Sequence, residues 1–190
     1  GRSSFELSSN FDEVMGIDFS RRFIETATAM KAGETPSFRL QEEGERFTSH
    51  RASVPASARR ERVSFEVGDA CHLREDIGQF DALLTANLLC RLPKPSAFLA
   101  RLMEGDGLLR VGGIWVNVSP FSWLEEYTPR SEWLIGNPET SVKTSAQALE
   151  QRLSDRFELL RHEDMPLVIR EHARKYQYIL SDLTIWKRVR

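Results

Sequence analysis

The 190-residue chain is long enough to bury the core of one domain, and its apolar share of 41% and charged share of 28% are ordinary for a globular protein. Its formal net charge of -2 provides no global field that would attract nucleic acid or an anionic membrane. No apolar run approaches the roughly 20 residues of a membrane-spanning helix, and the first residues lack a signal-peptide pattern. Cys71 and Cys90 are too few for a disulfide framework or a zinc site. We therefore expect a cytoplasmic protein without nucleic-acid, membrane or metal binding.

Short β-rich runs alternate with longer amphipathic segments. The N-terminal third is expected to hold, in order, the remainder of a helix at 3–9, a strand at 13–17, a helix from the N-cap Ser20 to Gly33, and a strand at 63–67. Residues 34–60 are polar and contain a pattern typical of a small hairpin around Glu43 and Gly44. We interpret them as an insertion at the edge of the sheet.

Residues 80–87 form a nearly continuous apolar run, which is typical of a central parallel strand covered on both faces. After it we expect a helix at 95–109, a strand at 114–119 that follows a turn at Gly112 and Gly113, an aromatic loop at 120–142, a helix at 145–154, and two final strands at 157–165 and 176–187. The basic residues 187–190 are interpreted as a solvated tail.

Alternating strands and helices with right-handed crossovers predict an α/β fold, a Rossmann-like, doubly wound and mostly parallel sheet. The final strand pair predicts an antiparallel edge strand. The first strand of such a sheet has no counterpart in the sequence, and we expect it to precede Gly1. Residues 1–190 are therefore interpreted as one N-terminally incomplete domain.

The start of the chain carries the pattern of a nucleoside-binding βαβ unit. Gly1 opens a helix, and Asp18 ends the next strand at the spacing expected if Gly1 is the last glycine of a cofactor loop. A carboxylate there can accept two hydrogen bonds from a ribose diol, and Phe19 is its neighbour. The alternative is that Asp18 only forms a turn before the following helix.

Two further strand ends border the same predicted crevice. Asp69 and Ala70 follow the strand at 63–67, where a carboxylate can accept a bond from an exocyclic amine such as that of adenine. Asn87 ends the strand at 80–87 and is expected near a transferable group. The alternatives are a Gly-Asp turn that caps the next segment and an asparagine that merely caps a strand end.

The succession of Gly68-Asp69-Ala70, the apolar strand ending at Asn87, and Gly112-Gly113 before another apolar strand resembles class I S-adenosylmethionine (SAM)-dependent methyltransferases. Three longer stretches narrow the resemblance. They are residues 87–93 (NLLCRLP), 119–129 (SPFSWLEEYTP) and 165–176 (MPLVIREHARKY), together with the start, residues 1–7 (GRSSFEL). These resemble the C-terminal methyltransferase domain of the ovothiol biosynthetic enzyme, 5-histidylcysteine sulfoxide synthase.

The resemblance implies transfer of a methyl group from SAM to an imidazole nitrogen of 4-mercaptohistidine (5-thiohistidine), which gives ovothiol A and S-adenosylhomocysteine. It also implies a small-molecule substrate and a sulfoxide synthase domain fused or associated upstream. The His-rich iron site of that domain is not in this chain.

The loop after the strand at 114–119 can close over the crevice. Trp123 and Tyr127 could stack on an imidazole, and Glu125 or Glu126 could face the ammonium group of an amino acid. We group Tyr127 and Glu126 with the candidate catalytic residues. The alternative is that Trp123 fills the core and that the glutamates form a solvated face.

The connection at 170–174 between the last two strands carries a second candidate cluster. Arg170 and Arg174 could hold a substrate carboxylate, and His172 could serve as the general base. A single histidine in a loop is more often exposed or a hydrogen-bonded anchor. The three other histidines, His50, His72 and His162, show no partner pattern and are interpreted as structural or exposed.

Three functions stay open at this stage. The first is the mercaptohistidine N-methyltransferase. The second is a SAM-dependent methyltransferase that acts on another small amino-acid or thiol-imidazole acceptor. The third is a SAM-binding module without turnover.

Overall fold

The computed structural model describes residues 1–135 and 142–190, so the end of the predicted aromatic loop, residues 136–141, lies outside the described residues. The chain divides into two compact units. Unit 1 comprises residues 1–70 and 170–177, and unit 2 comprises residues 71–169 and 178–190. No helix in the described residues is long and apolar enough to cross a membrane.

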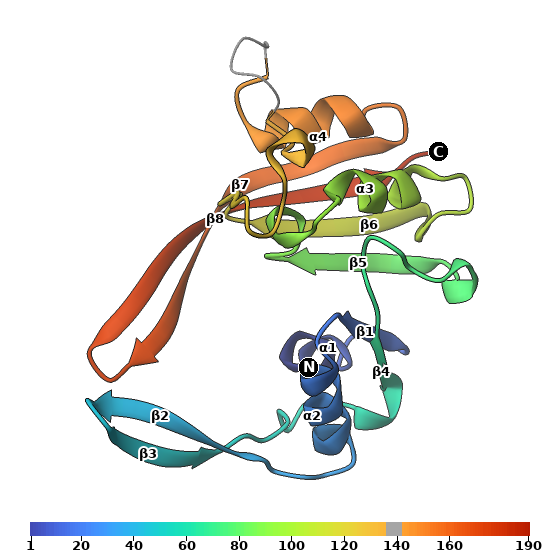
Figure 1. Ribbon diagram of the computed structural model, residues 1–190. Coiled ribbons are helices and arrows are strands. Elements are labelled where there is room, and N and C mark those ends of the chain that lie inside the picture. Colours follow the sequence, from blue (N-terminus) through green and yellow to red (C-terminus); the bar gives the residue numbers. More distant parts are fainter. Residues whose placement is uncertain (136–141) are drawn as a thin grey trace. The chain divides into compact units, whose positions relative to one another are not determined.

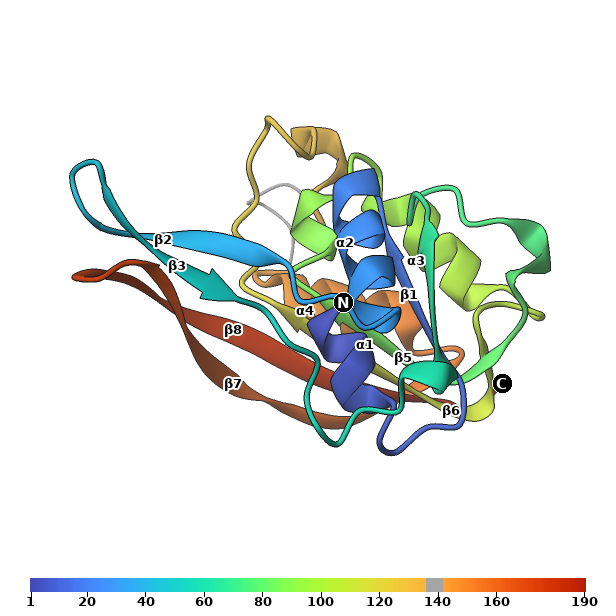
Figure 2. The ribbon, with the colours of Figure 1, turned by 90° about the horizontal axis from the view of Figure 1, so that it is seen from below.

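Unit 1 contains a parallel strand pair, two helices and a hairpin (Figure 1). Its elements are α1 (Arg2–Leu7), β1 (Val14–Asp18), α2 (Arg21–Lys31), β2 (Ser37–Glu43), β3 (Arg46–Arg51) and β4 (Val63–Val67). β1 pairs in parallel with β4, and β2 pairs in antiparallel with β3. The hairpin predicted inside the polar insertion is therefore confirmed. It projects away from α1, α2, β1 and β4 (Figure 2).

Local sequence signals explain where α2 begins and ends. The Ser20 hydroxyl accepts a hydrogen bond from the Phe23 amide, which satisfies one of the helix's free N–H groups. Gly33, with φ +106°, turns the chain away after the last helical residues. These caps confirm both ends of the predicted helix.

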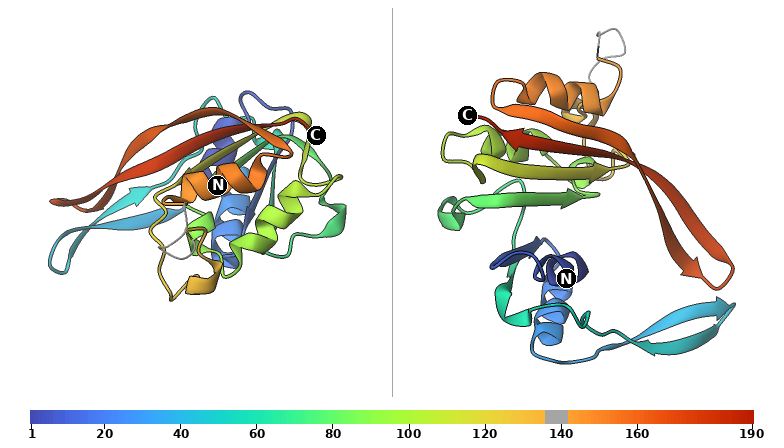
Figure 3. Two further views of the ribbon diagram at one scale, coloured as in Figure 1. Left: turned by 90° about the horizontal axis from the view of Figure 1, so that it is seen from above. Right: turned by 180° about the vertical axis from the view of Figure 1, so that it is seen from behind.

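Unit 2 is built on a four-stranded mixed sheet of order β5-β6-β8-β7. Its elements are β5 (Phe80–Ala86), α3 (Pro95–Met103), β6 (Leu109–Ser119), α4 (Ser145–Leu153), and β7 (Phe157–His172) and β8 (Lys175–Arg188) except for their tip at 170–177, which belongs to unit 1. β5 and β6 run parallel, whereas β8 runs antiparallel to β6. The predicted antiparallel strand is therefore present, but it lies between β6 and β7 and not at the edge of the sheet. α3 and α4 cover the same face of this sheet (Figure 3).

The core of unit 2 lies between this sheet and its two helices. Trp115 on β6 faces Trp186 on β8 in the strand register, and the Phe98 ring of α3 lies 6.2 Å from that of Trp115. Leu99, Leu102, Leu149 and Leu153 complete the apolar layer and are fully buried. The apolar faces of the two helices are thus the surfaces that pack on the sheet.

A buried polar row crosses three strands beside the two tryptophans. The Trp115 indole donates to the Thr85 hydroxyl at 2.9 Å, and Thr85 donates to the Asn117 amide oxygen at 3.0 Å. Asn117 in turn donates to Thr184 at 3.5 Å. Because buried polar groups are costly unless bonded, this row specifies the pairing of β5, β6 and β8.

Three sequence-based element boundaries are wrong. The helix predicted to reach Leu109 ends at Met103, because Gly105 and Gly107 follow and favour a turn over a helix. The strand predicted from Ile114 already begins at Leu109, and Gly112, with φ +87°, lies inside it where the pairing with β5 shifts register.

The predicted end of the penultimate strand at Met165 is the third wrong boundary. β7 continues through Pro166 to His172, so only a two-residue turn separates it from β8. Proline is compatible with this strand because β7 lies at the edge of the sheet, where an amide that points outward needs no partner.

Arg188 contradicts the interpretation of residues 187–190 as a solvated tail. Its side chain is fully buried, at 1% exposure. The guanidinium donates to the carbonyl oxygens of Leu109, Glu104 and Gly105 at 2.5, 2.6 and 2.7 Å. Arg188 therefore ties the end of β8 to the turn between α3 and β6.

Candidate active site

The first group of predicted site residues lies in unit 1, at the carboxyl ends of β1 and β4. Asp18 is the last residue of β1 and is exposed, and its Oδ1 accepts a hydrogen bond from the Ser20 amide at 2.8 Å. The Gly68 amide donates to the Asp18 carbonyl, so Asp69 follows directly after the paired strands. The structure thus brings Asp18, Asp69 and Ala70 to one end of this strand pair, where parallel sheets bind ligands.

Two neighbours of Asp18 have properties that suit a bound nucleoside. Phe19 is 82% exposed, which leaves its ring face available for stacking. A Cβ atom at Gly1 would lie 2.8 Å from the Ala27 Cβ and 3.0 Å from the Phe65 ring, so the start of α1 requires glycine. Glycine at the end of a cofactor loop serves this close packing of helix on strand.

The second group lies in unit 2, at the carboxyl ends of β5 and β6. Asn87 follows β5 with φ +54°, and its backbone N–H donates to the Val118 carbonyl at 2.8 Å. Phe121 follows β6 with φ +46°, and its amide donates to the Ser119 hydroxyl at 3.1 Å. Left-handed backbone is uncommon for residues other than glycine and concentrates at functional sites.

The aromatic loop after β6 is held by interactions within unit 2. Trp123 is buried, and its indole donates to Ser145 at 3.0 Å. The centroids of the Phe121 and Trp133 rings lie 6.2 and 6.3 Å from that of Trp123, with nearly parallel planes. This is the geometry of the core-filling alternative for Trp123. Its stacking on a ligand remains a prediction.

Tyr127 and the two predicted glutamates lie on the surface of the same loop. The Tyr127 ring is half exposed and lies 5.0 Å from the Arg91 guanidinium carbon, a cation–π geometry. Glu125 pairs with Arg130 at 2.6 Å, and Glu126 is exposed. Tyr127 and Glu126 therefore have the accessibility that their predicted catalytic role requires.

Arg91 is a residue that the sequence reasoning did not select. Its guanidinium donates to the Ser122 carbonyl at 2.7 Å and to the Ser122 hydroxyl at 3.1 Å, while its face lies over Tyr127. It thereby fixes the loop to the segment after Asn87. Its place in the stretch 87–93 (NLLCRLP) is the one feature of the sequence that could have identified Arg91 as a site residue. Its partner Ser122 lies 31 residues away in the chain, so no local pattern indicates the contact.

The third group, Arg170, His172 and Arg174, lies at the tip of β7 and β8 and belongs to unit 1. Arg170 pairs with Glu42 of β2 at 3.3 Å, and the Ala173 amide donates to the Gln41 carbonyl at 3.2 Å. The His172 Nδ1 accepts from the Arg174 amide at 3.2 Å, which is the geometry of the hydrogen-bonded anchor alternative. Its role as a base remains a prediction.

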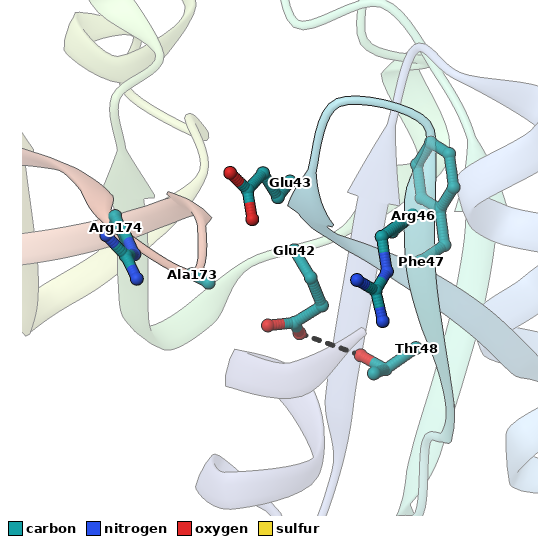
Figure 4. Close-up of a pocket in the computed structure, with 7 residues that line it drawn as sticks. All are labelled: Glu42, Glu43, Arg46, Phe47, Thr48, Ala173 and Arg174. Carbon is teal, nitrogen blue, oxygen red and sulfur yellow. Dashed lines mark hydrogen bonds between the residues drawn. The ribbon is translucent and has the colours of Figure 1, made fainter.

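An open cavity of about 420 Å³ lies where this tip meets the β2–β3 hairpin (Figure 4). Its lining residues are Glu42, Glu43, Arg46, Phe47, Thr48, Ala173 and Arg174. The Glu42 carboxylate accepts a hydrogen bond from Thr48 at 2.9 Å. Arg174 is the one predicted site residue that lines this cavity. The charges of the lining side chains balance, because two arginines face two glutamates.

Comparisons with known proteins identify the fold. No protein-family model and no curated protein matches the chain. A solved SAM-dependent methyltransferase from Methanosarcina mazei matches with a TM-score of 0.60 and 20% identity, over 98% of this chain and 86% of that one. A SAM-dependent methyltransferase from Anabaena variabilis matches with a TM-score of 0.52 and 16% identity, over 99% and 73%.

A third matching structure is described as showing the conversion of a disulfide bond into a thioacetal group during echinomycin biosynthesis. It matches with a TM-score of 0.59 and 17% identity, over 100% of this chain and 72% of that one. At these identities the similarity establishes the architecture. The chain has the α/β fold of SAM-dependent methyltransferases.

Proposed function

We propose that the protein is a SAM-dependent N-methyltransferase that methylates an imidazole nitrogen of 4-mercaptohistidine to give ovothiol A. The observation that carries the methyltransferase part is the fold shared with the solved SAM-dependent methyltransferases. The support for the acceptor is the resemblance of residues 87–93, 119–129 and 165–176 to the methyltransferase domain of ovothiol biosynthesis. A sulfoxide synthase domain or partner would form the ring C–S bond that mercaptohistidine carries, because this bond must exist before the ring is methylated.

The residues of unit 1 suit the nucleoside part of SAM. In this proposal the Asp18 carboxylate accepts hydrogen bonds from the ribose hydroxyls, and Asp69 and Ala70 contact the adenine. Asp18 already uses Oδ1 for the Ser20 amide, and Oδ2 accepts no other hydrogen bond within the described part of the chain. Phe19 supplies an apolar ring face and Gly1 permits close approach of the backbone.

The acceptor is a zwitterion with an aromatic ring, and its recognition needs matching groups. Tyr127 and Trp123 are proposed to contact the imidazole, and Glu125 or Glu126 the ammonium group. Arg170 and Arg174 are proposed to bind the carboxylate, and His172 is the candidate base that the sequence suggests. SAM supplies an electrophilic methyl group, so the main task of these side chains is to hold the ring nitrogen in line with it.

We also propose that the domain to which residues 1–190 belong includes one more parallel strand. Within the described residues β1 pairs with β4 alone and β5 pairs with β6 alone, so each has an unpaired edge. Leu84 of β5 is 40% exposed, although its apolar sequence is typical of a strand covered on both faces. An added strand that precedes Gly1 would pair with one of these unpaired edges.

The decisive experiment incubates the full-length protein with SAM and mercaptohistidine and detects the product by mass spectrometry. We expect N-methylated mercaptohistidine and S-adenosylhomocysteine in equal amounts. Absence of the methylated product would contradict the proposal. Histidine and other imidazole thiols serve as competing acceptors, and preferential methylation of one of them would favour the broader methyltransferase function. Binding of S-adenosylhomocysteine without turnover of any acceptor would favour a binding module.

A further inference from the structure

A row of polar residues crosses the carboxyl end of the unit 2 sheet. Asn87 follows β5, Ser119 ends β6 and is paired in register with Asp182 of β8, and Asp182 contacts His162 of β7. The four strands follow one another in the order β5-β6-β8-β7, so each contributes one member of the row. Neighbouring strands lie about 4.8 Å apart, and the row therefore spans about 14 Å.

His162 and Asp182 form a hydrogen-bonded pair within this row. The His162 Nε2 lies 2.8 Å from the Asp182 Oδ2. A carboxylate only accepts hydrogen bonds, so the imidazole must donate from Nε2, and its lone pair is then on Nδ1. The neighbouring charges of β7, Arg161 and Glu163, pair with each other at 2.6 Å.

The His162 side chain is more exposed to solvent than that of its partner Asp182. The His162 side chain is 46% exposed, so a ligand can reach its ring and a proton can leave to solvent. The Asp182 Oδ1 is buried and accepts no hydrogen bond from the described residues. The Asp182 carboxylate therefore holds the imidazole from one side, while the rest of the ring is open to a ligand.

We propose that His162, oriented by Asp182, accepts the proton that methylation releases from the imidazole acceptor. This inference rests on the proposed function. The acceptor nitrogen bonds to the methyl carbon as the methyl–sulfur bond breaks, and the electron pair of that bond stays on sulfur. The N–H proton of the ring passes to the Nδ1 of His162, which leaves a neutral methylated ring and an imidazolium paired with Asp182.

The position of the pair fits this role. Asn87 at the opposite end of the row is the residue expected near the transferable methyl group. In this proposal the acceptor ring lies over the row, with its N–H within hydrogen-bonding reach of the His162 Nδ1. His172, the base predicted from the sequence, instead uses its Nδ1 to accept the Arg174 amide.

The test compares His162→Gln, Asp182→Asn and the control His50→Gln, whose parent side chain stacks on Phe38 of the β2–β3 hairpin. We expect His162→Gln to lower kcat by about 100-fold, the lower range for general base catalysis. The KM for SAM and the affinity for S-adenosylhomocysteine should stay within twofold of wild type. Asp182→Asn should lower kcat at least tenfold, because an amide neither fixes the tautomer nor stabilises the imidazolium.

Chemical rescue separates a proton acceptor from a structural residue. His162→Ala should regain kcat on addition of imidazole, because the half-exposed site admits a free ring, whereas the Asp182→Asn variant should not respond. Methylimidazole formed from the added imidazole is distinguished from methylated mercaptohistidine by mass. Wild-type kcat in His162→Gln, or no rescue in a His162→Ala variant that still binds S-adenosylhomocysteine, would overturn the proposal.

The same experiment tests the proposed acceptor and the role of His162 separately. A wild-type protein that methylates histidine instead of mercaptohistidine contradicts the proposed acceptor, and the three variants then decide the role of His162 with histidine as the acceptor. A wild-type protein that methylates no imidazole contradicts both the proposed function and the role of His162.

Discussion

Arg188 shows how much one charged side chain contributes to the packing of unit 2. Its guanidinium is buried and satisfies three carbonyl oxygens that lie where α3 ends and β6 begins. The turn at 104–107 provides no comparable cap for α3, since Glu104 leaves the helix in extended backbone. The side chain therefore substitutes for a C-terminal cap.

We predict that Arg188→Leu destabilises the protein by about 3 kcal/mol, because the carbonyls lose charge-assisted hydrogen bonds and become buried without partners. Arg188→Lys should recover only part of this loss, since an ammonium group cannot bond all three carbonyls in the planar geometry of a guanidinium. Urea unfolding measures both changes. The control Arg190→Leu changes an exposed residue and should stay within about 0.5 kcal/mol of wild type.

Sequence patterns identified the residues at strand ends and helix caps, but not the pairs that are distant in the chain. Asp18, Asn87 and Ser20 could be placed because strand ends and helix caps have local signatures. The pairs Arg91–Ser122, His162–Asp182 and Arg188–Leu109 join positions 31, 20 and 79 residues apart, and nothing local in the sequence marks them. The charged run Arg161-His162-Glu163-Asp164 looks the same in the sequence whether or not a carboxylate lies opposite His162.

At the scale of elements, hydrophobic periodicity placed most helices and strands, and boundaries failed where two tendencies compete. Pro166 suggested that a strand ends, yet the edge position of β7 tolerates it. Gly112 suggested a turn, yet it forms an irregularity inside β6. Both outcomes depend on the neighbouring strand, which the local sequence does not specify.

The packing of α1 on β1 depends on the absence of a side chain at Gly16. An added Cβ would lie 2.6 Å from the Ser4 Oγ of α1 and 2.9 Å from the Phe65 ring. We predict that Gly16→Ala destabilises the protein by about 1–3 kcal/mol through overpacking, measured by thermal unfolding. Gly105→Ala, with no atom within 4 Å of the added Cβ, is the matched control. Equal loss in both variants would contradict the packing argument.

The β7–β8 turn carries a pH-dependent contact. The hydrogen bonds from Lys175 and then Gln177 hold the pKa of Glu171 below the usual range of a glutamate. A lowered folded-state pKa stabilises the turn above the unfolded pKa, and this contribution is lost as the pH falls through the folded value. We predict that amide exchange at residues 171–177, corrected for intrinsic rates, accelerates below about pH 4.

Glu171→Gln tests this contact directly, because the variant has no carboxylate to protonate. It should show the faster exchange at neutral pH and no further change on acidification. Glu158→Gln, at the start of the same strand, should retain the wild-type pH dependence. The effect should be small, because the Glu171 carboxylate is exposed to solvent screening.

At the scale of the whole molecule, ligand binding should appear as added stability of the folded chain. A ligand that binds only the folded state at one hundred times its Kd stabilises it by about 2.7 kcal/mol. S-adenosylhomocysteine should therefore raise the unfolding free energy of the full-length protein by this amount at that concentration.

Asp18 and Asp12 provide a matched pair for this measurement, because they flank β1 at its carboxyl and amino ends. Asp12 forms an exposed ion pair with Arg62 at 3.3 Å and lies at the end of the strand away from the predicted ligand. We predict that Asp18→Ala reduces the stabilisation by S-adenosylhomocysteine by about 1–3 kcal/mol, the penalty for leaving hydrogen-bonding ribose hydroxyls without an acceptor. Asp12→Ala should retain the full increment. Equal increments in both variants would remove Asp18 from the cofactor site, whereas loss of the increment in both would indicate damage to β1 rather than a lost ligand contact.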